Sequence, residues 1–157
     1  FDSRGLAMAL SMGASGVWVG TRFVACEESE AAPYHKKLLI EAKYTDTIRT
    51  LLYTGRPMRC LKTPFINSWE NIPERKKMAQ ESLDSGRIPF PLGSEAKGLD
   101  PLPEGHSGKE WLARRPWLMG QCAGAIGKVQ TAEEIIKEMV TGAVAQINRA
   151  SAFVAKL

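Results

Sequence analysis

The sequence predicts an α/β protein, and three features predict it. A short apolar run follows a helix-like segment, two strand-like segments flank a turn, and a long amphipathic helix lies near the C-terminus. The chain has 157 residues, of which 44% are apolar and 24% are charged. This composition is that of a globular domain large enough to bury a core, so we expect a folded chain.

The N-terminal segment predicts one helix and one buried strand. Asp2 or Ser3 can cap a helix with apolar residues at i, i+3 and i+4, and Gly13 is placed to end it. The apolar run at residues 17–19 predicts a strand that opens into a loop at 20–23. Parallel strands need neighbours and covering helices, so this segment predicts a fragment of a βα repeat.

The middle of the chain predicts a helix, a strand pair and a second helix. The first helix spans about 29–43, with a proline tolerated in its first turn. Residues 47–53 and 58–63 flank a Thr-Gly-Arg-Pro turn, which favours a β-hairpin. A charged helix is expected at about 69–83, where Pro73 lies in its first turn or separates two pieces.

The C-terminal part predicts a long loop and then a long helix. Residues 84–108 are rich in proline and glycine, and loops of this length are usually functional or disordered. Thr131 and Glu134 form a capping box at the start of the helix. An apolar stripe at helical spacing follows it. The stripe consists of Ile135, Ile136, Met139, Val140, Ala143, Val144 and Ile147.

Charge and cysteine content argue against several classes of protein. The 21 basic and 17 acidic residues are interspersed, so nucleic-acid binding is not indicated. No apolar run is long enough to span a bilayer, and the N-terminus has no signal-peptide pattern. Cys26, Cys60 and Cys122 form no CxxC pair, so neither a metal site nor a disulfide framework is expected. We therefore expect a cytoplasmic protein that binds no membrane.

One short motif suggests phosphate chemistry. Gly20 and Thr21 lie where the predicted strand ends, which is where parallel α/β barrels place their sites. A glycine there lets backbone N–H groups approach a phosphate, and the threonine hydroxyl adds a donor. A simple strand-ending turn explains the same residues, so the motif alone leaves both interpretations open.

Three stretches together resemble one enzyme family. Residues 2–29 look like the end of the barrel in the nitronate monooxygenases (2-nitropropane dioxygenases), which are FMN-dependent (β/α)8-barrel oxidoreductases. Residues 120–126 are similar to the Gly-Gln-x-x-Gly segment before the family's last barrel helix, and 47–62 resemble its strand pair. The resemblance implies the C-terminal portion of a TIM barrel, with the last strand and helices, and an inserted smaller α+β substrate domain.

The resemblance also implies a division of the chain. Residues 1–28 would form the end of the FMN-binding barrel, and 29–117 the inserted substrate domain with its long loop. Residues 118–157 would return to the barrel and supply its last helix. Because the chain begins at Phe1 and contains one predicted barrel strand, we expect a piece of a longer protein, inactive by itself.

By the same resemblance, the FMN phosphate would be held by Gly20 and Thr21 together with the backbone of Trp18 and Val19. Gln121, an amide between glycines, is the candidate substrate-binding residue; a loop residue bonded to the backbone is the equal alternative.

The catalytic histidine of the family would lie before Phe1. Neither His35, on a predicted helix, nor His106, in the Pro/Gly-rich loop, matches its motif. We therefore assign no catalytic residue in this chain.

The implied activity is the oxidation of an alkyl nitronate by dioxygen, which gives a carbonyl compound and nitrite. A flavin-dependent enoyl-acyl carrier protein reductase is the first alternative, because those enzymes share this barrel end. A non-catalytic remnant that acts as a binding module is the second. The sequence leaves the oligomeric state open.

Overall fold

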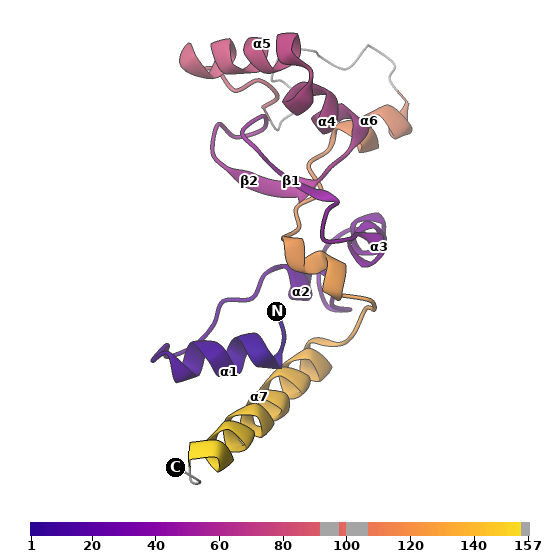
Figure 1. Cartoon of the computed structure of the whole chain (residues 1–157). Helices are drawn as coiled ribbons and strands as arrows, with labels where there is room; N and C mark the ends of the chain where they lie inside the picture. Colours follow the sequence, from indigo (N-terminus) through magenta and orange to yellow (C-terminus); the bar gives the residue numbers. More distant parts are fainter. Residues whose placement is uncertain (92–97, 100–106, 155–157) are drawn as a thin grey trace. The chain divides into compact units, whose positions relative to one another are not determined.

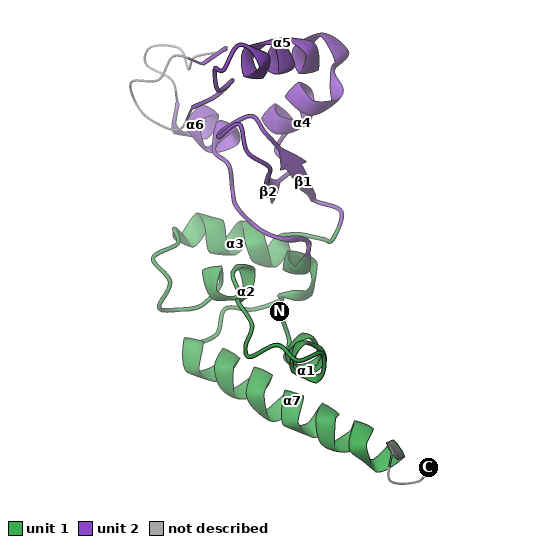
Figure 2. Ribbon diagram, turned by 90° about the vertical axis from the view of Figure 1, so that its left-hand side faces the viewer, with its two compact units in different colours: residues 1–44, 122–157 green, residues 45–121 purple. Residues whose placement is uncertain are grey.

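In the computed structural model, residues 1–91, 98–99 and 107–154 are described, and they form two compact units. The first unit combines residues 1–44 with 122–157, and the second comprises 45–121 (Figure 2). These limits differ from the domain boundaries expected at 29 and 118. The assignment of the domains to a barrel and a substrate domain stays a prediction.

Two helices of the first unit lie side by side (Figure 1). Helix α1 (Ser3–Ser11) is capped by Asp2, whose carboxylate accepts a hydrogen bond from Gly5 N at 2.9 Å. Gly13, with a φ of 91°, follows its end, as expected. Helix α7 (Ala132–Val154) begins at the predicted capping box: Thr131 Oγ1 accepts from Glu134 N at 3.1 Å, and Thr131 N donates to the Glu134 carboxylate at 3.0 Å.

Only part of the apolar stripe on α7 is covered. Ile135, Met139 and Ala143 are buried. Cys26, Leu6 and Phe23 pack in one cluster with Ile135 and Met139. Helix α1 also lies against α7. The remaining stripe residues are exposed. These are Ile136, Val140, Val144 and Ile147.

The predicted buried strand at residues 17–19 is wrong for this chain. These residues belong to no strand, and Trp18 is 99% exposed. A parallel strand is held by hydrogen bonds to strands beside it, and the described residues supply none for this segment. The segment therefore joins no sheet in the part of the chain that the structure describes.

Two short helices and all but the first residue of a 3-10 turn complete the first unit. They are α2 (Thr21–Val24), α3 (Pro33–Glu41) and η1 (Gln121–Ala125). Helix α3 is shorter than the expected 29–43, because Pro33 fixes its start. Lys36 links this helix to the segment that precedes it, since its Nζ donates to Cys26 O at 2.6 Å and to Glu27 O at 3.1 Å.

The second unit contains the predicted hairpin. Strands β1 (Thr47–Thr50) and β2 (Met58–Leu61) pair antiparallel, with Thr47 opposite Leu61 and Thr50 opposite Met58. A core of Leu52, Tyr53, Cys60, Ile66, Trp69, Ala79 and Phe90 lies beneath it.

Three helices complete the second unit: α4 (Pro64–Asn71), α5 (Pro73–Asp84) and α6 (Gly108–Arg114). Pro73 separates α4 from α5 and occupies the first turn of α5, so both of the arrangements considered for this proline are present. Most of the predicted loop at 84–108 lies outside the described residues. None of the described helices is long and apolar enough to cross a bilayer.

Candidate functional site

The predicted phosphate loop, residues 18–21, leads into the short helix α2 and includes its first residue, Thr21. Gly20 is the N-cap of α2, and its carbonyl accepts hydrogen bonds from Phe23 N at 2.9 Å and Val24 N at 3.1 Å. Among the described residues, the N–H groups of Trp18, Val19 and Gly20 donate no hydrogen bond. Backbone N–H groups at a helix start are suited to an anion.

Nothing in the fold of the described residues requires a glycine at position 20. Its φ of −97° is accessible to any L-residue, and a Cβ placed on it would meet nothing within 4 Å. Gly124 differs, because a Cβ there would collide with Tyr44. The absence of a side chain at Gly20 leaves the backbone open to a close approach, so these residues fit a phosphate group.

Two successive side chains of this loop differ in burial: one packs against the protein and the next lies in solvent. Val19 is half-buried and packs with Phe23 against the cluster formed by Cys26, Ile135 and Met139. Trp18, one residue earlier, has its side chain almost wholly in solvent. The loop is thus anchored to α7 through Val19 while its opposite face stays open.

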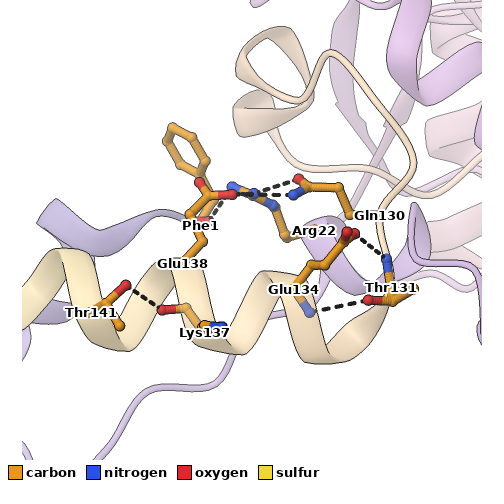
Figure 3. A network of polar contacts seen from close by, with 8 residues as sticks. All are labelled: Phe1, Arg22, Gln130, Thr131, Glu134, Lys137, Glu138 and Thr141. Atoms are coloured by element: carbon orange, nitrogen blue, oxygen red, sulfur yellow. Dashed lines mark hydrogen bonds and ion pairs between the residues drawn. The ribbon is translucent and has the colours of Figure 1, made fainter.

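Arg22, two residues after Gly20, is committed to protein partners (Figure 3). It is 7% exposed, and its Nη2 donates to Gln130 Oε1 and to Glu138 Oε2, both at 2.9 Å. Its Nη1 donates to Phe1 O at 3.3 Å. A buried guanidinium needs such partners, because an unpaired charge in this position would be costly.

Glu28 makes a second link between the loop region and α7. Both of its carboxylate oxygens accept from Ala132 N, at 3.0 and 2.9 Å. Hydrogen bonds from its own backbone N–H and from that of Ala132 lower the pKa of this carboxyl. A negative charge at the start of α7 also matches the helix dipole.

The structure describes two of the other candidate residues, Gln121 and His35. Gln121 is the exposed first residue of η1, and its substrate role stays a prediction. His35 is half-buried in α3. His106 lies outside the described residues.

Sequence reasoning did not find Arg22, Gln130 and Glu138 as a group. The only local signal was an arginine beside the Gly-Thr pair; its two side-chain partners lie 108 and 116 residues away. Contacts at that separation depend on the tertiary fold.

Known proteins match the chain over nearly all of its length. The family model described as nitronate monooxygenase matches residues 1–142. A Bacillus subtilis protein with the name probable nitronate monooxygenase is 34% identical over 57% of this chain and 23% of its own length. A hydroxy-methyl-oxo-octahydroindene-carboxyl-CoA dehydrogenase of Mycobacterium tuberculosis is 28% identical over 98% of this chain and 50% of its own length.

A solved structure also matches nearly the whole of this chain and less than half of the other protein. FabK from Thermotoga maritima superposes with a TM-score of 0.64 and 29% identity, covering 97% of this chain and 44% of FabK. The chain therefore spans about half or less of the proteins that it matches.

The matched family consists of TIM-barrel flavoenzymes with oxidoreductase activity. Because its model covers residues 1–142, this chain belongs to the nitronate monooxygenase family.

Proposed function

We propose that the intact protein oxidises alkyl nitronates with dioxygen to carbonyl compounds and nitrite, and that residues 18–21 hold the phosphate of FMN. Family membership supports the reaction class. The observation that carries the cofactor assignment is Gly20, where neither packing nor φ calls for a glycine but a closely bound phosphate does.

The role of this chain is to bind and orient. The N–H groups of Val19 and Gly20 are the backbone donors, and the Thr21 hydroxyl adds another. Gln121 is our candidate for contact with the substrate. FMN supplies the electron transfer when it is bound. We expect the 157-residue chain to be inactive alone, since its relatives are at least about twice as long.

The cofactor assignment is tested by comparing FMN with riboflavin, which lacks the phosphate. Each flavin is titrated with the chain and the quenching of its fluorescence is followed. The dissociation constant should be lower for FMN than for riboflavin. Thr21→Ala should weaken FMN binding, and Gly20→Val should weaken it more. Gly16→Val is the matched control, because Gly16 is also open and has no left-handed φ, yet lies outside the predicted site. Equal binding of FMN and riboflavin would count against the phosphate contact.

The activity is tested in a fusion of this chain to the N-terminal part of the Bacillus subtilis relative. Nitrite release from an alkyl nitronate in the presence of dioxygen, without NAD(P)H, is the expected result. If the fusion binds neither FMN nor nitronate while the chain alone is monomeric and folded, the proposal fails and a non-catalytic binding module is favoured.

A flavin-dependent enoyl-acyl carrier protein reductase is the second candidate function. The likeness to FabK favours it, and so does a relative named as a dehydrogenase of a CoA thioester that matches 98% of this chain. NAD(P)H-dependent reduction of an enoyl thioester by the fusion, without nitrite release from nitronates, would select this candidate.

A further inference from the structure

A basic residue beside a phosphate loop is ordinarily expected to contact the phosphate, since a guanidinium matches that anion well. Arg22 does not have that freedom. Its Nη2 is shared between Gln130 and Glu138, and its Nη1 donates to Phe1 O. The side chain is also 7% exposed, so little of it can reach a ligand in solvent.

The network around Arg22 is closed on itself. Gln130 Nε2 donates to Glu138 Oε2 at 3.3 Å, and the same oxygen accepts from Arg22 Nη2 at 2.9 Å. Each of the three side chains therefore contacts the other two (Figure 3). Such a triangle fixes the guanidinium more firmly than a single ion pair does, because shared partners restrict one another's rotamers.

The network joins the phosphate loop to the start of α7. Glu138 lies on α7, and Gln130 comes just before it. Gln130 also forms a β-bridge with Cys26, and its carbonyl accepts from Glu27 N at 2.9 Å. The backbone at Cys26 and Glu27, shortly after the loop, is thus paired with Gln130, just before α7.

The loop has few bonds of its own. Among the described residues, the backbone hydrogen bonds of Gly20 are those that its carbonyl accepts from Phe23 N and Val24 N. The position of its N–H groups is therefore set by the turn of α2 that follows and by the side chains anchoring that turn. Arg22 is the buried polar member of that turn.

We propose that Arg22, Gln130 and Glu138 are positioning residues, which orient the backbone of residues 18–21 for the FMN phosphate without touching it. This inference rests on the proposed function for the purpose of the loop. It assigns to α7 the task of holding the cofactor loop in place, so removing the charge of Glu138 should alter phosphate binding.

The test uses Glu138→Gln, which keeps the size of the side chain and removes its charge. Glu133→Gln is the matched control, because Glu133 is an exposed residue in the first turn of the same helix and makes no side-chain hydrogen bond or ion pair with the described residues. In the ligand-free chain, the ¹H–¹⁵N resonances of residues 19–21 should shift in Glu138→Gln and stay in place in Glu133→Gln. The dissociation constant for FMN should rise about tenfold in the first variant only.

A rescue separates positioning from general damage. The double variant Gln130→Glu/Glu138→Gln moves the carboxylate to the other acceptor of the same guanidinium nitrogen. It should return the amide resonances toward wild type and restore FMN affinity to within about threefold. If Glu138→Gln unfolds the chain, Arg22→Lys serves instead, with Arg4→Lys as its control. The lysine keeps the charge, but its single ammonium group cannot reproduce the forked hydrogen bonds of the guanidinium.

Unchanged loop resonances in both Glu138→Gln and Arg22→Lys would overturn the inference, as would an unrescued double variant with normal helix content. Absence of FMN binding to the wild-type chain and to its fusion would contradict the proposed function instead. In that case the resonance shifts and their rescue still decide whether the network positions the loop.

Discussion

Gly124 lies against Tyr44 so closely that a Cβ on the glycine would stand 2.8 Å from Tyr44 Cγ and 2.9 Å from the carbonyl carbon of Lys43. Real Cβ atoms essentially never approach other atoms this closely. The second glycine of the Gly-Gln-x-x-Gly segment is therefore required by packing within the first unit. The Cβ would also meet the backbone nitrogen of Tyr44, so backbone atoms of both Lys43 and Tyr44 are involved, and these cannot give way as a flexible side chain can.

Gly124→Ala should lower the free energy of unfolding by about 1–3 kcal/mol through overpacking. Gly127→Ala is the control, since a Cβ at Gly127 would meet nothing within 4 Å. It should change stability by less than about 1 kcal/mol. Urea denaturation followed by circular dichroism measures both. Equal effects of the two substitutions would show that the contact with Tyr44 does not limit this position.

Helices α1 and α7 meet at another glycine. A Cβ on Gly142 would lie 2.5 Å from Ser3 Cβ and 2.6 Å from Ser3 Oγ. Gly142→Ala gains about 1 kcal/mol of helix propensity but should still destabilise the chain, because the clash is with an atom fixed by the backbone of α1. Adding Ser3→Gly removes that atom and should recover part of the loss. Additive effects in this double-mutant cycle would contradict a direct contact.

Local signals predicted the elements that depend on local interactions. The capping box at Thr131 and the cap at Asp2 both lie where the sequence placed them, because a helix cap is a contact between residues three positions apart. The hairpin followed from its turn chemistry. Helix α6 also begins at a capping box, Ser107 with Glu110, but the surrounding glycines and prolines led us to expect a loop there.

The features that failed or were missed depend on distant groups. The strand at residues 17–19 was predicted from its apolar composition, which carries no information about whether partner strands are present. The residues proposed to hold the phosphate are contiguous, so the sequence alone could suggest them, and their role stays a proposal. The network that anchors them was not identified from sequence, because Arg22 and Glu138 are brought together only when α7 packs beside α2.

Stability at acid pH should depend on Glu28. Its pKa is lowered by hydrogen bonds from its own N–H and from Ala132 N, so its contribution is present above the ordinary glutamate value of 4.5 and is lost as the pH falls below it. Glu28→Gln should lower the melting temperature near pH 7 and have little effect near pH 3. Glu27→Gln, at the exposed neighbouring carboxyl, is the matched control and should leave the melting temperature near pH 7 unchanged. A constant difference between Glu28→Gln and wild type at all pH values would contradict the assignment.

Stability at alkaline pH should depend on Cys60, which is fully buried in the core of the second unit. Burial, and then the nearby Glu70 carboxylate, raise the pKa of this thiol from 9.0 to about 11. The folded state therefore keeps the proton where the unfolded state loses it. The contribution of the thiol to stability is complete below pH 9 and is lost as the pH rises to about 11.

Urea denaturation of wild type and Cys60→Ala between pH 7 and pH 11 tests this prediction. The variant should be the less stable at pH 7, because truncation leaves a small cavity, and the difference should shrink by about 1–3 kcal/mol across the alkaline range. Cys122→Ala, at a half-exposed thiol, should run parallel to wild type. A difference between wild type and Cys60→Ala that stays constant up to pH 11 would mean that the buried thiol does not couple to folding, and the loss of stability at alkaline pH would then have to come from other groups.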